Sequence, residues 1–238
     1  NHEHLVIFVH GFNNTELQTN ERAAHIDSKL GTDQVITTAF NWSSVGCAVF
    51  AKGNPLNGLA YKWDQKSATK IAKYFVLYLE EIRKNDIHVF KQVDIVCHSM
   101  GNHILVQSIM HCYENEILHI FKQSNIISVA PDAEKEDYIV AAEYLTDEES
   151  PIVSKWIHYW NKSDGALITS KIANATLKGL SVRAGSGHVN VGSPRFQSFK
   201  WEKALGSHGY IDNILENDYK FKAHLFRWLK LKIPAEDK

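Results

Sequence analysis

A serine at position 99 stands at the centre of residues 93–105, which read VDIVCHSMGNHIL. An apolar run precedes it and a helical pattern follows it, and a serine at such a turn is either a nucleophile or a helix cap. A nucleophilic serine needs a raised hydroxyl, a neighbouring base and backbone N–H groups that receive a developing oxyanion. The residues two before and two after must also be small, and here they are Cys97 and Gly101. Cys97 departs from the glycine of the usual GxSxG pattern.

A second turn follows the first apolar run, in the stretch LVIFVHGFNN at residues 5–14. In a serine hydrolase with a strand-to-helix nucleophile turn, the loop after such a strand donates one oxyanion N–H, and the residue after the nucleophile donates the other. The candidate donors are therefore the backbone N–H groups of Phe12 and Met100. Gly11 would allow the close backbone approach. Taken alone, His10 and Gly11 also fit an ordinary turn that ends a strand.

Seven segments, in chain order, resemble the α/β-hydrolases, and among them an uncharacterised bacterial branch catalogued as a domain of unknown function. They are VHGFNN at 9–14, FNW at 40–42, YKWDQKSA at 61–68, CHSMGNHIL at 97–105, APDAE at 130–134, DGALITS at 164–170 and GSHGY at 206–210. The serine motif is common to many hydrolases, whereas DGALITS resembles the DxALxxS segment of this branch. The resemblance implies a serine hydrolase similar to carboxylesterases and lipases.

A nucleophilic serine needs a histidine base and a carboxylate that orients this base, in the order Ser, Asp or Glu, His for this fold. Asp132 and Asp164 both follow apolar runs, at the end where a parallel sheet collects its functional groups. Asp164 is favoured because it follows the later run and because the resemblance places the acid in the DxALxxS segment. Asp132 remains the alternative. Asp164 is also suited to cap a helix over residues 165–177.

His208 is the predicted base. It lies in the glycine-flanked loop GSHGY, after the strand-like RFQSFKW and before a predicted C-terminal helix. His188, which also lies near glycines, is its competitor. His98 adjoins the nucleophile and is expected to pack beside the turn. Other histidines fall inside predicted elements and are expected to be structural, namely His103, His111, His158 and His224.

Apolar runs of strand length alternate with helical periodicity along the chain. The runs are residues 5–9, 35–40, 93–96, 126–129 and 157–160, and most are apolar at successive positions, as in strands covered on both faces. Helical stripes are predicted at 68–82 after a cap at Asp64, at 104–112 and at 221–229. The pattern predicts an α/β fold with a mostly parallel sheet flanked by helices, in one domain over residues 1–238. The resemblance implies an α/β-hydrolase fold that lacks some N-terminal strands, which are expected either to be absent from a minimal sheet or to lie upstream of Asn1.

Two segments with several glycines, residues 43–63 and 179–195, are predicted to be long irregular loops. Their apolar side chains either roof an acyl pocket or pin the loops to the body of the protein. These side chains are Phe50, Leu56, Leu59, Tyr61, Trp63, Leu180 and Val182, together with Trp42 just before the first segment.

Composition narrows the class of protein further. The 238 residues are 44% hydrophobic and carry a formal net charge of −1, so no excess of positive charge favours nucleic acid or an anionic membrane. Three cysteines without CxxC spacing argue against a disulfide framework and a zinc site. No apolar run approaches the ~20 residues of a membrane span, and no signal peptide is recognised, so a cytoplasmic chain is expected.

The expected substrate is a small-molecule or lipid-like acyl ester or thioester, cleaved through an acyl-enzyme. No metal or other cofactor is expected, because a serine triad needs none. A noncatalytic scaffold of the same fold that binds proteins, and an amidase or peptidase with the same triad, are the alternatives.

Overall fold

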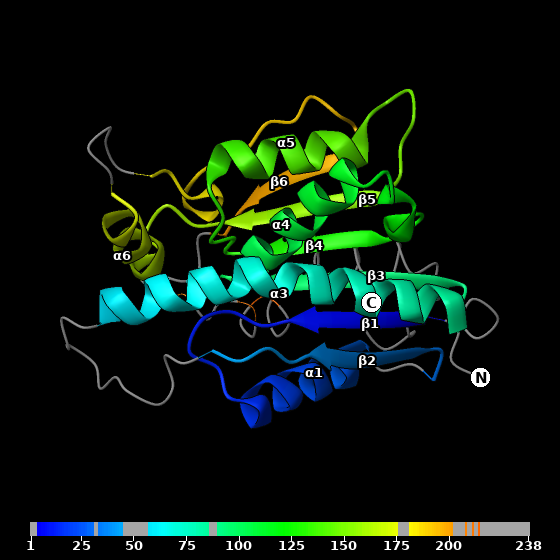
Figure 1. Ribbon diagram of the computed structural model, residues 1–238, viewed down its shortest axis with the longest axis horizontal. Helices are drawn as coiled ribbons and strands as arrows, with labels where there is room; N and C mark the ends of the chain where they lie inside the picture. The colour runs from blue at the N-terminus through cyan, green and yellow to red at the C-terminus, as the bar shows by residue number, and fades with distance from the viewer. Residues whose placement is uncertain are drawn as a thin grey trace, which may run out of the picture.

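The computed structural model describes residues 4–30, 33–44, 57–85, 90–175, 181–201, 208, 211 and 214. Within these residues six strands form one parallel sheet in the order β2-β1-β3-β4-β5-β6 (Figure 1). The strands are β1 (His4–Val9), β2 (Val35–Phe40), β3 (Gln92–His98), β4 (Asn125–Val129), β5 (Lys155–Trp160) and β6 (Phe196–Lys200). β1 and β4 are buried along their whole length, as expected for strands covered on both faces.

Helices cover the sheet on both faces. They are α1 (Glu16–Leu30), α3 (Asn57–Asn85), α4 (Gly101–Glu114), α5 (Lys135–Thr146) and α6 (Gly165–Ala173), with 3-10 turns η1 (Leu118–Phe121) and η2 (Ala184–Ser186). Figure 1 shows α3, α4 and α5 in front of the sheet, and their apolar side chains share one core cluster. α1 packs into a second cluster with Ile211 and Ile214. The parallel α/β fold predicted from the sequence is confirmed.

The predicted start of the helix after β2 is wrong. α3 begins at Asn57 rather than after a cap at Asp64, so residues 57–63 of the predicted loop are helical. Asp64 lies inside the helix, is fully buried and accepts a hydrogen bond from the Ser44 hydroxyl at 2.5 Å. Ala60 and Tyr61 are buried one helical turn earlier and extend the apolar stripe of α3. Residues 45–56 and the predicted helix at 221–229 lie outside the described residues.

The segment 181–195 is irregular as predicted, apart from the short turn η2. It is held against the residues that follow β4, because Gly185 N–H donates to Pro131 O at 2.8 Å and Ala184 N–H donates to Ala133 O at 3.0 Å. A methyl group on Gly185 would lie 2.6 Å from Pro131 N. The close approach of the two segments therefore requires glycine at this position.

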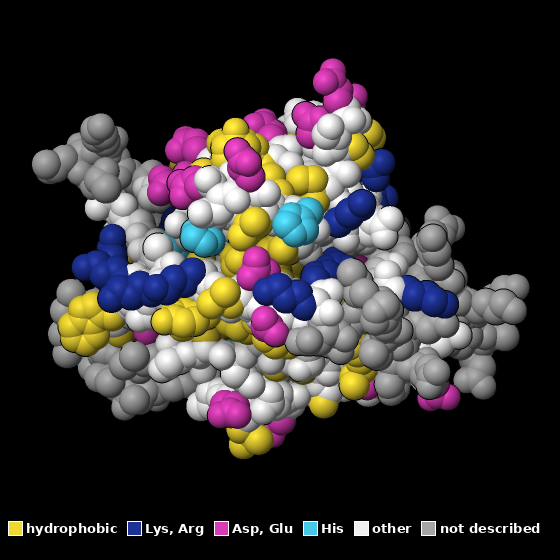
Figure 2. All heavy atoms as spheres, turned by 45° about the vertical axis from the view of Figure 1, so that its right-hand side comes forward, with side chains coloured by type: hydrophobic (Ala, Val, Ile, Leu, Met, Phe, Trp, Pro, Cys, Tyr) yellow, Lys and Arg dark blue, Asp and Glu magenta, His cyan; other side chains and the backbone are white. Residues whose placement is uncertain are grey.

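The surface that faces the reader in Figure 2 carries Lys and Arg side chains interspersed with Asp and Glu. None of the described helices is both long and apolar enough to cross a bilayer. Cys97 and Cys112 are buried free thiols, and Cys47 lies outside the described residues.

Candidate active site

The candidate site lies at the edge of the sheet where the strands end. Gly11 and Phe12 follow β1, Ser99 follows β3, and Asp164 follows β5. Because all six strands are parallel, their carboxyl ends share one edge, which is on the left in Figure 1. Residues that are far apart in the sequence thus come together.

Ser99 sits at a sharp turn between β3 and α4, with a backbone φ of +53°. This left-handed conformation is uncommon for a residue other than glycine. Its N–H continues the sheet by donating to Val129 O at 3.0 Å. Its carbonyl oxygen accepts hydrogen bonds from the backbone N–H groups of Asn102 at 3.0 Å and Asp132 at 3.1 Å. The turn is therefore fixed from both sides.

The side chains of Ser99, His208 and Asp164 form a hydrogen-bonded row. His208 Nε2 lies 2.6 Å from Ser99 Oγ, and His208 Nδ1 lies 2.8 Å from Asp164 Oδ2. If Nδ1 carries the imidazole proton and donates it to Asp164, Nε2 is free to accept the proton of the serine hydroxyl. This arrangement is capable of base-assisted nucleophilic attack by Ser99.

Asp164 is held in place by a second set of contacts. It is 1% exposed, and its Oδ1 atom accepts hydrogen bonds from the backbone N–H groups of Ala166 and Leu167, both at 3.1 Å. The predicted capping role of Asp164 at the start of α6 is confirmed, although the helix ends at Ala173. One carboxylate thus both caps a helix and contacts the imidazole.

Two glycines allow the loops around Ser99 to touch. A methyl group on Gly11 would lie 2.6 Å from Ser99 Cβ, and one on Gly101 would lie 2.4 Å from Val9 O. Gly101, two residues after the serine, must therefore be small because the end of β1 lies against the first turn of α4. Both contacts are too short for any side chain.

The backbone N–H groups of Phe12 and Met100 are the predicted oxyanion donors. Among the described residues, neither group donates a hydrogen bond to a protein acceptor. The Asn14 side chain steadies the first loop by donating to Gly11 O at 3.2 Å and Phe12 O at 3.0 Å. Met100 immediately precedes α4, where the helix dipole favours negative charge. The role of the two N–H groups as oxyanion donors stays a prediction.

His98 contacts the backbone of His208, the predicted base. Its Nε2 lies 3.1 Å from the carbonyl oxygen of His208, and the two rings are 5.1 Å apart. Burial, followed by the proximity of His208, lowers the pKa of His98 well below its ordinary value. A neutral His98 that carries its proton on Nε2 would donate it to that carbonyl oxygen.

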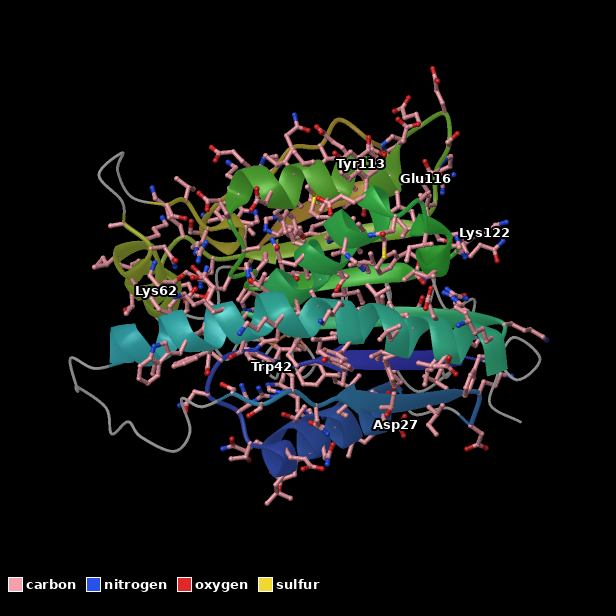
Figure 3. The ribbon with its side chains drawn as sticks, viewed as in Figure 1. Asp27, Trp42, Lys62, Tyr113, Glu116 and Lys122 are labelled. Carbon is pink, nitrogen blue, oxygen red and sulfur yellow. The ribbon has the colours of Figure 1, made fainter. Side chains whose placement is uncertain are left out.

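His10 supports the first loop in a similar way. Its Nδ1 lies 2.8 Å from Gly11 O, and its ring stacks on Trp42 with 5.0 Å between centroids. Trp42 Nε1 donates to His10 O at 2.9 Å. Burial lowers the pKa of His10. Figure 3 shows Trp42 near the end of β1, so this aromatic residue pins a loop to the body of the protein.

The alternative acid, Asp132, is engaged elsewhere. Its carboxylate forms a buried ion pair with Arg183, with 3.0 Å between Asp132 Oδ1 and Arg183 Nε. Tyr61 and Ser170 also donate hydrogen bonds to it. The competing base, His188, is exposed in the segment before β6. No described hydrogen bond joins either residue to Ser99 or His208 through its side chain.

Sequence reasoning missed the partners of Asp132. Tyr61 and Ser170 occur within the segments YKWDQKSA and DGALITS, but nothing in those segments indicated that they meet. Arg183 is a single cation in a glycine-containing loop and carried no signal of its own. Two aromatic residues of the predicted loop, which lie in α3, differ in exposure: Tyr61 is buried, whereas Trp63 is 59% exposed.

Cys97 is not suited to be the nucleophile. It is fully buried in the core cluster, and burial raises the pKa of its thiol. Its carbonyl oxygen accepts a hydrogen bond from the Asn102 side chain at 3.1 Å. A protonated thiol in the core behaves as a small apolar side chain.

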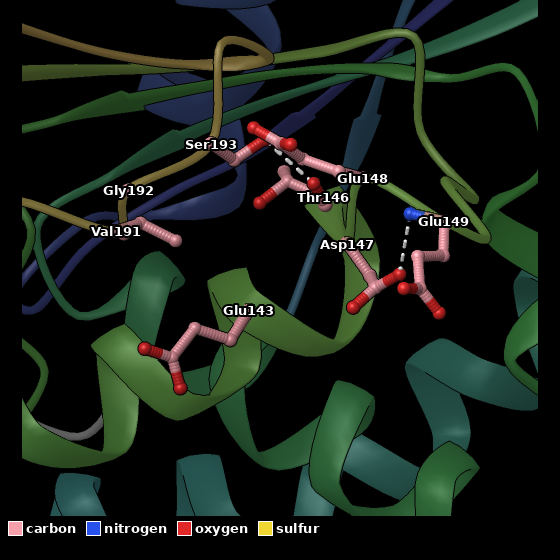
Figure 4. Close-up of a pocket in the computed structure, with 8 residues that line it drawn as sticks. All are labelled: Glu143, Thr146, Asp147, Glu148, Glu149, Val191, Gly192 and Ser193. Atoms are coloured by element: carbon pink, nitrogen blue, oxygen red, sulfur yellow. Dashed lines mark hydrogen bonds between the residues drawn. The ribbon is translucent and has the colours of Figure 1, made fainter.

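A surface pocket of about 380 Å³ lies between the end of α5 and residues 191–193 (Figure 4). It is lined mainly by acidic and small side chains, including Glu143, Asp147 and Glu149, and by none of the candidate residues. Within the described parts of the chain, no group of His, Cys, Asp and Glu side chains is arranged to hold a metal ion.

A parallel six-stranded sheet with a serine at a left-handed turn after a central strand defines the α/β-hydrolase class. The sequence matches the family described as alpha/beta hydrolase of unknown function (DUF900) over residues 1–199, so the chain belongs to this family. The resemblance noted in the sequence is therefore confirmed, and the family supports a hydrolase.

Two solved structures are similar to this chain. The product of gene lin2722 from Listeria innocua has a TM-score of 0.52 at 9% identity, covering 98% of this chain and 96% of that chain. At this identity the likeness shows the fold alone. The esterase Pf2001 from Pyrococcus furiosus has a TM-score of 0.42 at 13% identity, covering 96% of this chain and 83% of that chain. A search of curated protein sequences found no match.

Proposed function

We propose that this chain is a serine hydrolase that cleaves a carboxylic ester or thioester through an acyl-enzyme, with Ser99 as nucleophile, His208 as base and Asp164 as the acid that orients it. One observation carries the proposal: His208 Nε2 lies 2.6 Å from Ser99 Oγ while Nδ1 of the same ring lies 2.8 Å from Asp164. Membership of an α/β-hydrolase family supports it.

In the acylation step, His208 Nε2 takes the proton of the Ser99 hydroxyl while Oγ attacks the carbonyl carbon of the substrate. The carbonyl electron pair moves to oxygen, and the backbone N–H groups of Phe12 and Met100 donate hydrogen bonds to the resulting oxyanion. The tetrahedral intermediate then collapses. The bond to the alcohol or thiol breaks, and this leaving group takes the proton from the imidazolium.

In the deacylation step, water replaces the leaving group. His208 removes a proton from water, the hydroxide oxygen attacks the acyl carbon, and the Ser99 ester bond breaks. The proton returns to Ser99 Oγ, which restores the starting state and releases the carboxylic acid. Throughout, the Asp164 carboxylate stabilises the positive charge that forms on the imidazole.

The first test is covalent labelling with a fluorophosphonate probe. The native chain should be labelled, and digestion followed by mass spectrometry should locate the adduct on Ser99. Ser99→Ala should abolish labelling and lower ester hydrolysis by roughly 10³-fold or more. Ser108→Ala is the matched control, because Ser108 is a buried serine whose hydroxyl donates to Ala72 O at 2.9 Å, within the helical layer.

A native chain that neither reacts with the probe nor hydrolyses activated esters would favour the alternative of a noncatalytic scaffold that binds proteins. Activity on p-nitroanilides that exceeds activity on esters would favour an amidase or peptidase. A panel of p-nitrophenyl esters of increasing acyl length then defines the substrate class.

A further inference from the structure

A buried polar cluster lies behind the candidate catalytic residues and joins four segments of the chain. Its members are Tyr61 of α3, Asp132 after β4, Ser170 of α6 and Arg183 before η2. None is more than 8% exposed. We call these four residues the bracing network.

The Asp132 carboxylate is at the centre of the bracing network. Its Oδ1 accepts a hydrogen bond from the Ser170 hydroxyl at 2.6 Å and pairs with Arg183 Nε at 3.0 Å. Its Oδ2 accepts a hydrogen bond from the Tyr61 hydroxyl at 2.8 Å. Arg183 Nη2 in turn donates to the Tyr61 hydroxyl oxygen at 3.0 Å, which closes the network.

Stability alone gives a weak reason for such a cluster. Burying an ion pair incurs a desolvation cost, and an apolar replacement of similar volume is often equally stable or more stable. What distinguishes the bracing network is that its members contact three parts of the candidate site.

The first contact is with the nucleophile turn. The backbone N–H of Asp132 donates to Ser99 O at 3.1 Å. The Asp132 side chain is fixed by three donors, so the peptide unit that holds the Ser99 carbonyl is fixed with it. The bracing network therefore limits how far the turn can rotate.

The second contact is with the loop that offers an oxyanion N–H. The rings of Tyr61 and Phe12 meet edge to face, with 5.7 Å between centroids and an interplanar angle of 61°. An aromatic pair of this geometry fixes the Phe12 side chain. The position of the Tyr61 ring is fixed in turn by its hydroxyl, which hydrogen-bonds with Asp132 and Arg183.

The third contact is with the acid, through α6. Ser170 and Asp164 belong to the same short helix, with Asp164 at its N-cap. At the other end of α6, Asn174 donates to Ser170 O at 2.9 Å and accepts a hydrogen bond from Lys62 Nζ at 3.2 Å. Figure 3 shows Lys62 where α3 passes α6. The position of Asp164 thus depends on how α6 is anchored to α3 and Asp132.

We propose that Tyr61, Asp132, Ser170 and Arg183 are positioning residues that hold the nucleophile turn, the oxyanion loop and the acid-bearing helix in one geometry. This inference rests on the proposed function. None of the four side chains contacts the reacting atoms. Their effect is expected in the chemical step rather than in substrate binding, because small displacements of catalytic groups cost as much as about 10²-fold in rate.

The test compares two deletions of a hydroxyl in the bracing network with the same deletions elsewhere. Tyr61→Phe keeps the ring against Phe12, and Ser170→Ala removes only the hydroxyl. The controls are Tyr138→Phe and Ser108→Ala, since both residues are fully buried and lie outside the network. Measured on p-nitrophenyl acetate, kcat should fall about tenfold or more in the network variants, with KM within twofold of native, while both controls keep native kcat.

Arg183→Lys supplies a third variant that keeps the positive charge. Lysine lacks the planar guanidinium that reaches Asp132, Ser170 and Tyr61 together, so kcat should not recover to the native value. Urea unfolding of every variant separates lost stability from lost geometry.

Two outcomes overturn the inference in different ways. If the native chain is active and the network variants keep native kcat, whatever stability they lose, the bracing network is only structural and the proposed function stands. If the native chain is inert toward both esters and the fluorophosphonate probe, the proposed function fails and the positioning role fails with it.

Discussion

Both edges of the sheet bury a carboxylate, but each carboxylate has different partners. At the carboxyl edge, Asp132 pairs with the Arg183 guanidinium and accepts hydrogen bonds from two hydroxyls. At the amino edge, Asp94 of β3 accepts hydrogen bonds from the Gln92 amide at 2.9 and 3.1 Å and from Asn125 N–H at 2.7 Å. Burial raises the pKa of Asp94 to about 6, because these neutral donors and the positive charge of Arg83 only partly offset the loss of water.

The difference teaches that polar burial does not by itself mark a functional edge. The partners of Asp94 lie in β3 and at the start of β4, and none of them contacts a candidate catalytic residue. The partners of Asp132 reach the Ser99 turn and the helix that Asp164 caps. What distinguishes the carboxyl edge is the connection between the buried charge and the loops around Ser99.

The largest effect on activity is expected for Asp164→Asn. Asparagine is a good N-cap, so α6 should keep its start, and the stability should change by less than about 1 kcal/mol. The amide cannot hold the required imidazole tautomer, so kcat/KM should fall by roughly 10⁴-fold. Ester hydrolysis and urea unfolding measure the two quantities. A loss below tenfold would mean that another carboxylate, with Asp132 the first candidate, orients His208.

A smaller effect is expected for Gly11→Ala at the same edge. The added methyl group would meet Ser99 Cβ at 2.6 Å, so the loop must move and carry the Phe12 N–H away from its position. Loss of one oxyanion donor lowers kcat by about 10²–10³-fold. Gly187→Ala is the matched control, because its methyl group would meet no atom within 4 Å. Equal activity of the two variants would contradict the assignment of Phe12.

The smallest effect on activity is expected at the amino edge, for Asp94→Asn, which should leave kcat unchanged. Its effect should appear in stability. The folded pKa of about 6 lies above the ordinary aspartate pKa of 3.8, so the folded chain binds more protons than the unfolded chain in this window. The native protein therefore loses stability as pH rises from 4 to 6. At about 1.4 kcal/mol per pH unit, the native protein loses roughly 3 kcal/mol of unfolding free energy by pH 6 and above, and Asp94→Asn does not incur this loss.

Urea unfolding of the native chain and Asp94→Asn at pH 4, 5, 6 and 7 checks the sign. The stability of the variant relative to the native chain should rise with pH across this series. A difference that stays constant with pH would show that Asp94 titrates normally despite its burial. A fall in kcat would link the two edges and would contradict the comparison.

The strands were predictable because their signal is local. The run at residues 5–9 is apolar at every position, and β1 spans it with one residue more. The start of α3 was not predictable, because Asp64 has the residue type of a cap but is buried against Ser44 by tertiary contacts. A local pattern cannot distinguish a capping carboxylate from one that packs inside a helix.

In the candidate site, too, features with a local sequence signal were predictable and features set by tertiary contacts were not. Ser99, Gly101 and Gly11 were predictable because each falls in a local motif, although the contacts that require the two glycines join separate segments. The sequence favoured Asp164 over Asp132 through its later position and the DxALxxS resemblance, but it left Asp132 open, because both aspartates follow a strand at the same edge. The contact between Asp164 and His208 is a tertiary feature that the sequence does not show. The role of Arg183 was not predictable from the sequence, because it depends on contacts among four segments that are far apart in the chain.

The left-handed backbone at Ser99 lowers the stability of the protein at the residue that its proposed activity requires. A φ of +53° costs a serine roughly 1 kcal/mol that glycine would not incur, so Ser99→Gly is expected to make the protein more stable and inert. Glu116, with a φ of +59° beyond the end of α4, incurs a similar cost, and Glu116→Gly should recover it without loss of activity. A selection for heat resistance alone would therefore remove the residue on which the proposed chemistry depends, unless every round also demanded turnover.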